Sequence, residues 1–128
     1  MMKVLIVDDD EALTDLIKEI IEGIGIYRVK TAANGAEGYE AFFHFEPDII
    51  LTDIQMPVKN GLEMVSDVRN HDPGIKTIYM TGDMIQFRTR LEEEKTKYKA
   101  SLIEKPFSCS KLIGLFHEYQ KENGGGTR

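Results

Sequence analysis

The stretch VLIVDDDEAL, residues 4–13, sets four branched apolar residues directly before four acidic ones. Like charges side by side repel by about 4 kcal/mol per pair at a separation of about 4 Å and an effective dielectric constant of about 20. A fold that needed these acids only for solubility would scatter them over its surface. Their position at the end of an apolar run, which has the character of a buried strand, therefore indicates a positive charge among them.

Outward from this stretch, short apolar runs alternate with longer segments of helical periodicity. The expected strands lie at residues 4–7, 26–29, 48–52, 77–80 and 101–103, and the expected helices at 13–23, 36–45, 62–69, 84–95 and from Ser108 onward. This alternation, repeated five times, predicts an α/β fold with a doubly wound, five-stranded parallel sheet and helices on both faces. We expect one domain over residues 1–121, followed by a flexible tail or the start of a linker over 122–128.

The composition is that of an ordinary globular protein and argues against several functional classes. The 16 Lys and Arg residues against 22 Asp and Glu residues give a formal charge of −6, which does not favour direct binding of nucleic acid or of an anionic membrane. The single cysteine, Cys109, excludes an internal disulfide and a multi-cysteine metal site. Neither a signal peptide nor a membrane-length apolar run is evident, so we expect a cytoplasmic protein.

Polar side chains follow the apolar runs, at the carboxyl ends of the expected strands. In doubly wound sheets the ligand site lies at that edge, where the strand order reverses. Clustered carboxylates without Cys or His suit Mg²⁺, a lysine supplies a positive charge for a phosphoryl group, and a hydroxyl can hydrogen-bond that group. Asp10 is expected to be a helix N-cap or a surface acid. The candidates at this edge are Asp8, Asp9, Asp53, Thr81, Asp83 and Lys105.

Four motifs together resemble the receiver domain of bacterial two-component response regulators. They are VLIVDDDEAL (4–13), DIILTDIQMPVKNG (48–61), MTG (80–82) and EKPF (104–107). The resemblance extends from Lys3 to about Tyr119. It implies a flavodoxin-like sheet with the strand order 2-1-3-4-5, and it identifies residues 1–121 as a receiver domain.

The resemblance assigns phosphoryl chemistry to three residues. Asp53 would accept a phosphoryl group from a phosphohistidine and form an acyl phosphate. Lys105 would pair with the phosphoryl oxygens, and its bond to Pro106 is expected to be cis. Thr81 would hydrogen-bond the phosphoryl group and carry the signal outward.

The resemblance also implies a divalent cation, Mg²⁺ or Mn²⁺, among the acids. Asp9 and Asp53 would bind the cation directly, Asp8 through a water molecule, and Gln55 through its backbone carbonyl. Such a cation would supply the positive charge that the acidic run after residues 4–7 requires.

The partners implied by the family are a sensor histidine kinase or a histidine phosphotransfer protein, and a downstream protein or a covalently linked output domain. A homodimer through the face of the fourth helix, fifth strand and fifth helix is a further implication. The domain would catalyse only its own phosphorylation and dephosphorylation, without dedicated substrate turnover.

The chain departs from the family pattern at Leu102, where receivers usually carry Tyr or Phe. The polar segment RLEEEKTKYKA (90–100) is also unusual for the fourth helix and its exit. Because leucine has neither a ring nor a hydroxyl, we expect the signal to be read from the fourth helix, whose packing side carries Met84, Phe87 and Leu91.

Other interpretations compete with the receiver. A haloacid-dehalogenase-like phosphohydrolase also uses aspartate and Mg²⁺, and its DxD motif is formally present at residues 8–10, but Glu11-Ala12 replaces the usual Gly-Thr and no second acidic pair follows a late strand. A flavin-binding domain would need a Ser-, Thr- or Gly-rich phosphate loop after residues 4–7, which the chain lacks. A receiver-like module that binds proteins without phosphorylation is a third alternative, and the presence of all five site residues argues against it.

Overall fold

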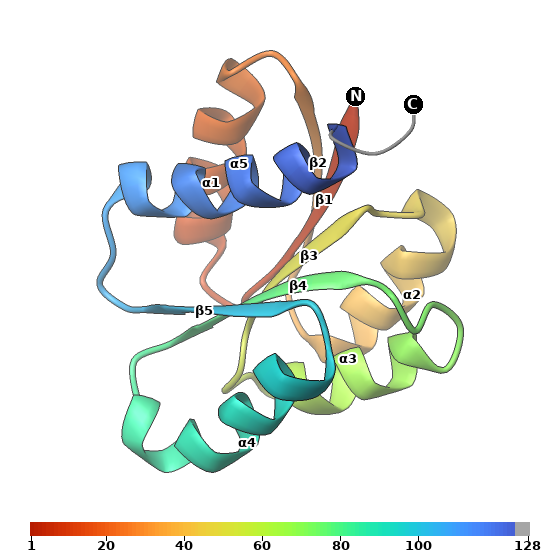
Figure 1. Ribbon diagram of the computed structural model, residues 1–128, viewed down its shortest axis with the longest axis vertical. Coiled ribbons are helices and arrows are strands. Elements are labelled where there is room, and N and C mark those ends of the chain that lie inside the picture. Colours follow the sequence, from red (N-terminus) through yellow and green to blue (C-terminus); the bar gives the residue numbers. More distant parts are fainter. Residues whose placement is uncertain (125–128) are drawn as a thin grey trace.

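Five strands and five helices alternate along residues 1–124, the part of the chain that the computed structural model describes (Figure 1). Every predicted element is present, with boundaries that differ from the predicted ones by a few residues. The predicted tail, 122–128, overlaps the end of the last helix, and residues 125–128 lie outside the described part, so the tail stays a prediction. The strands are β1 (Met2–Val7), β2 (Tyr27–Ala32), β3 (Ile49–Asp53), β4 (Lys76–Thr81) and β5 (Ala100–Glu104). The helices are α1 (Glu11–Gly23), α2 (Gly35–Phe45), α3 (Gly61–Arg69), α4 (Met84–Lys97) and α5 (Cys109–Gly124).

The strands form a single parallel sheet in the order β2-β1-β3-β4-β5. This order and the parallel pairing confirm the predicted doubly wound fold. The chain runs from β1 outward to β2, then crosses back to β3 and continues to β5. The direction of winding therefore reverses between β1 and β3, and the carboxyl ends of these two strands border the crevice where such sheets bind ligands.

The core has two apolar layers, one on each face of the sheet. Helices α1 and α5 cover one face, and α2, α3 and α4 cover the other (Figure 1). Along β1, Val4 and Ile6 pack under α1 and α5, while Leu5 and Val7 pack under the other three helices, and all four are fully buried. A strand covered on both faces has no solvent side, which explains why its sequence is continuously apolar.

Short polar side chains fix where the helices begin. The side chains of Asp10, Asn34, Asn60 and Asp83 each accept a hydrogen bond from a backbone N–H in the first turn of the helix that follows. The hydroxyl of Ser108 accepts one from the backbone of Lys111 at the start of α5. These bonds satisfy N–H groups that have no partner within the helix, and they confirm the N-cap expected at Asp10.

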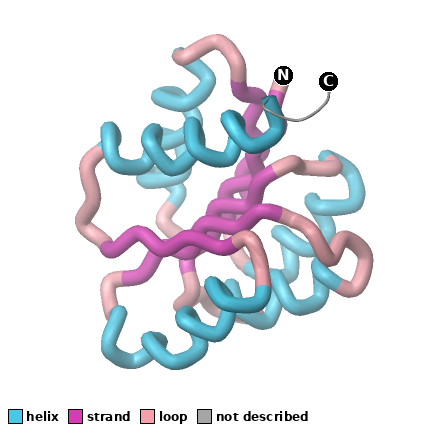
Figure 2. The backbone as a smooth tube through the Cα atoms, viewed as in Figure 1, coloured by secondary structure: helices cyan, strands magenta, loops and turns pink. Residues whose placement is uncertain are grey.

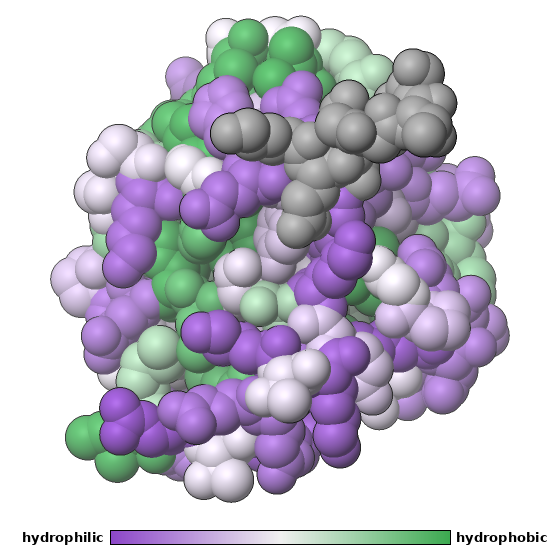
Figure 3. Space-filling model, in the orientation of Figure 1, coloured by the Kyte–Doolittle hydropathy of each residue, from purple (hydrophilic) through white to green (hydrophobic). Residues whose placement is uncertain are grey.

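The surface seen in Figure 3 is mainly hydrophilic, with apolar side chains in smaller patches between polar ones. No helix within residues 1–124 combines the length and apolar character that spanning a membrane would require.

Candidate functional site

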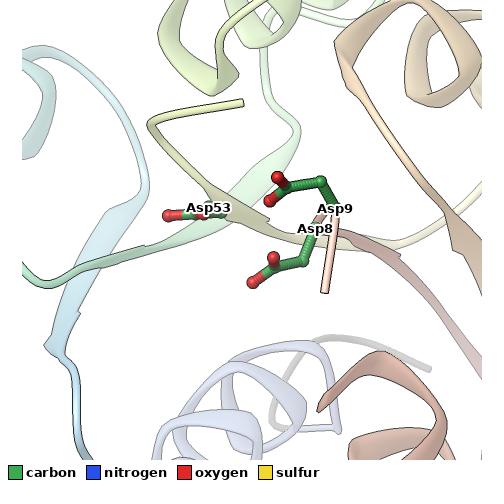
Figure 4. Close-up of side chains that lie close together, drawn as sticks. All are labelled: Asp8, Asp9 and Asp53. Carbon is green, nitrogen blue, oxygen red and sulfur yellow. The ribbon is translucent and has the colours of Figure 1, made fainter. Parts of the chain in front are cut away.

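Three carboxylates converge where β1 and β3 end. Asp8 and Asp9 directly follow β1, Asp53 is the last residue of β3, and these strands are neighbours in the sheet. Figure 4 shows the three side chains extending in the same direction from the two strand ends. One oxygen of each carboxylate lies within 4.8 Å of the others. Asp8 and Asp53 are buried and Asp9 is exposed, so the cluster opens to solvent on one side.

Lys105 reaches this cluster from β5, two strands away from β3. Its Nζ donates a hydrogen bond to Asp8 Oδ2 at 2.9 Å and lies 3.5 Å from Asp53 Oδ2. The Lys105-Pro106 peptide bond is cis, as the family resemblance implied. The loops that leave β3, β4 and β5 lie on one side of the sheet (Figure 2), and Lys105 is the first residue after β5.

Burial and charge alter the protonation of these groups. Burial raises the pKa of Asp53 and the charge of Asp8 raises it further, while Lys105 and the N–H of Ile54 lower it in part. Burial lowers the pKa of Lys105, but the hydrogen bond to Asp8 and the charges of both acids outweigh burial, so the net pKa is raised. The lysine is therefore a stable positive charge between two buried acids.

Thr81 ends β4, one residue beyond Met80, which pairs with Asp53 across the sheet. The threonine is buried, and its hydroxyl accepts a hydrogen bond from the backbone N–H of Asp83 at 2.9 Å. The Asp83 side chain caps α4 by accepting from the N–H of Gln86. Asp10 and Asp83, which also follow expected strands, therefore act as helix caps, and Thr81 is one residue beyond the strand partner of Asp53 and is hydrogen-bonded to the start of α4.

The loop from Gln55 to Asn60 is shaped by contacts that sequence reasoning did not identify. Gln55 lies two residues beyond Asp53, and its side chain approaches that of Gln86 at 3.5 Å. Val58 has a φ of 72°, inside a tight turn in which the N–H of Lys59 donates to the carbonyl of Pro57. A Cβ added at Gly61 would lie 2.1 Å from the Asp53 carbonyl oxygen. Only glycine permits this approach of α3 to the end of β3.

The donor set fits the divalent cation that the family resemblance implies. Among the described residues, Asp8, Asp9 and Asp53 form the one group of three or more carboxylate, imidazole or thiol side chains close enough to share a metal ion. All three offer hard oxygen ligands, which Mg²⁺ prefers. Mutual repulsion between the acids, partly offset by Lys105, also favours a bound cation.

Comparison with known proteins identifies the family to which this site belongs. Residues 4–116 match the response regulator receiver domain. The chain belongs to this family. A chemotaxis protein CheY from Thermotoga maritima is 33% identical over 119 residues, which cover 93% of this chain and 98% of that protein. A CheY-like receiver domain structure from Methanospirillum hungatei has a TM-score of 0.83 and 28% identity, and covers 98% of this chain and 99% of that one.

Receiver domains occur both alone and within longer regulators, and the relatives include both forms. YesN of Bacillus subtilis, an uncharacterized transcriptional regulatory protein, is 32% identical over 120 residues, which cover 92% of this chain but 32% of that protein. The chain thus spans nearly the whole of one relative and about a third of another.

The family match confirms the receiver resemblance, its fold and its role in two-component signalling. Receiver domains are signalling modules that work with histidine kinases and output domains, and they are not dedicated substrate-turnover enzymes. The phosphohydrolase alternative gains no comparable support, because the match extends from the first strand to α5.

Proposed function

We propose that Asp53 accepts a phosphoryl group from a sensor histidine kinase or a histidine phosphotransfer protein. The observation that carries this proposal is the convergence of Asp8, Asp9 and Asp53 beside the ammonium of Lys105. A nucleophilic carboxylate, a cluster of oxygen donors and a positive charge are the groups that phosphoryl transfer to an aspartate requires.

Asp8, Asp9, Asp53 and the backbone carbonyl of Gln55 would hold Mg²⁺ or Mn²⁺. When bound, the cation would offset the charge of the acids and of the phosphoryl oxygens. The family match and the spacing of the three carboxylates support this assignment.

The chain's own residues then act in a simple sequence. A carboxylate oxygen of Asp53 attacks the phosphorus of the phosphohistidine, an O–P bond forms as the N–P bond breaks, and the imidazole nitrogen keeps the electron pair. Lys105 stabilises the charge on the phosphoryl oxygens, and the hydroxyl of Thr81 turns toward them. Water later attacks the phosphorus and releases phosphate, so the domain returns to its starting state without turning over a separate substrate.

The signal would pass to a downstream protein or to a covalently linked output domain, with a homodimer through the α4-β5-α5 face as a further outcome. A cytoplasmic location belongs to the same proposal, because histidine kinases draw their phosphoryl groups from ATP.

Incubation with phosphoramidate or acetyl phosphate and Mg²⁺ tests the proposal by intact-protein mass spectrometry. The expected result is one added phosphoryl group, absent in Asp53→Asn and reduced but present in Asp8→Asn. The phosphohydrolase alternative requires the reverse, with Asp8 as nucleophile and multiple turnover of phosphate esters. Unmodified wild-type protein under conditions that phosphorylate a known receiver would overturn the proposal.

A further inference from the structure

The side of α4 that packs against the sheet ends in an acidic residue. Met84, Phe87 and Leu91 face the sheet from the first two turns, and the next position on this side is Glu94. A buried apolar residue is the usual occupant of such a position. Polar side chains cover most of the outer side of α4 (Figure 3), but Glu94 lies on the inner side, where its side chain is only 12% exposed.

Glu94 joins α4 to two other elements. Its Oε1 accepts a hydrogen bond from the Tyr79 hydroxyl of β4 at 2.5 Å and another from Arg69 Nη1 of α3 at 2.6 Å. The Arg69 guanidinium also lies over the ring of Tyr98, 3.6 Å from its centroid, just beyond the end of α4. We call these four residues, Arg69, Tyr79, Glu94 and Tyr98, the Glu94 anchor.

The anchor is secured by burial as well as by charge. The Tyr79 side chain is fully buried and that of Arg69 is 8% exposed. Hydrogen bonds to charged groups are stronger than neutral ones, and a buried arginine that loses its carboxylate leaves an uncompensated charge. The second half of α4 is therefore fastened to both β4 and α3.

The first half of α4 is held differently. Met84 and Phe87 are only half-buried and Ile85 is 91% exposed, so the packing of this half becomes tight only at its last residue, Leu91, which is fully buried. The helix begins at the Asp83 cap, whose backbone N–H donates to the hydroxyl of Thr81. The start of α4 is thus loosely packed and hydrogen-bonded to Thr81, the residue that follows the strand partner of Asp53, while its end is held by Glu94.

We infer that the Glu94 anchor holds the second half of α4 in place, so that a shift of Thr81 displaces only the first half, residues 84–91. This inference rests on the proposed function, because the phosphoryl group on Asp53 supplies the reason for Thr81 to move. Tyr79 lies two residues before Thr81 on β4. The same strand therefore carries Thr81, which shifts, and Tyr79, which holds the second half of α4 through Glu94. A partner protein would then meet a changed conformation only at the exposed start of α4, and not over the whole α4-β5-α5 face.

Amide hydrogen exchange of the full chain, with and without Mg²⁺ and beryllofluoride, tests this inference. In wild type, exchange should change in residues 81–91 and stay unchanged in 92–99. In Glu94→Gln and Tyr79→Phe the change should extend through 92–99, with exchange there altered about fivefold, the equivalent of one lost hydrogen bond. Glu93→Gln, on the exposed side of the same turn, is the matched control and should behave as wild type.

The outcomes separate the inference from the proposed function. Equal changes in both halves of α4 of the wild type, together with changes near Asp53, would overturn the inference alone. A wild-type pattern in both Glu94→Gln and Tyr79→Phe would also overturn it. No change at residues 53–61 or 81–83 would overturn the proposed function and the inference with it. Tyr79→Phe removes a single hydroxyl, so the test does not depend on the stability of Glu94→Gln.

Discussion

Adding Mg²⁺ should stabilise the folded protein by relieving repulsion among Asp8, Asp9 and Asp53. Two unit charges 4.8 Å apart, the upper limit between oxygens in this cluster, repel by about 3.5 kcal/mol at an effective dielectric constant of about 20. Lys105 offsets part of this energy, so the attainable gain is smaller. At a Mg²⁺ concentration about ten times Kd, linkage gives about 1.4 kcal/mol, which for a domain of this size raises Tm by about 5 °C.

Thermal unfolding followed by circular dichroism, over a Mg²⁺ titration at constant ionic strength, measures this effect. Asp9→Asn should abolish the rise in Tm because it removes the side chain that we propose as a direct ligand. Asp10→Asn should keep most of the rise, because Asp10 caps α1 and lies outside the cluster. A wild-type Tm that does not change in millimolar Mg²⁺, or a rise in the Tm of Asp9→Asn equal to that of the wild type, would refute the reasoning.

Three further substitutions near the site, and one control in α5, are tested by urea unfolding without Mg²⁺. Asp53→Asn should raise the free energy of unfolding at pH 7 by on the order of 1 kcal/mol. Burial and the charge of Asp8 raise the Asp53 pKa in the folded protein, so the wild type is most stable below the ordinary carboxyl pKa and loses stability as the pH rises toward neutrality. A variant less stable than wild type at pH 7 would contradict this sign. Val58→Asn should stabilise by about 1 kcal/mol, because a β-branched residue at φ 72° is strained where asparagine is tolerated; an unchanged urea midpoint would count against that strain. Gly61→Ala should destabilise the fold by about 3 kcal/mol or more, because the new Cβ would clash with the Asp53 carbonyl. The control, Gly114→Ala, has open space around it in α5 and should stabilise the fold by about 1 kcal/mol. Equal effects of the two substitutions would argue against the close approach of Gly61 to the end of β3.

The strands and helices could be predicted from the sequence because a strand that is buried on both faces of a sheet has a recognisable, continuously apolar sequence. Strands β1 and β3 have no solvent side, so their runs are continuously apolar, and Asp10 and Ser108 mark helix starts by ordinary capping chemistry. The strand order could not be predicted in this way, because periodicity does not specify which strands are neighbours. That order came from the family resemblance.

The site was predictable in part for a similar reason. Residues that follow parallel strands meet at one edge, so Asp8, Asp53 and Lys105 could be grouped from their positions alone. The Glu94 anchor could not be found this way, because it depends on contacts between segments distant in sequence. The polar character of residues 90–100 was visible, but nothing in the sequence paired Glu94 with Arg69.

The central claim is that Asp53, rather than Asp8 or another acid of the cluster, carries the phosphoryl group. Borohydride reduces an aspartyl phosphate to homoserine, so peptide mapping of the phosphorylated, reduced protein locates the modified residue directly. We predict homoserine at position 53 and nowhere else, with none formed when Mg²⁺ is removed by a chelator. Homoserine at position 8, or an unmodified position 53 in protein shown to carry a phosphoryl group, would contradict the account.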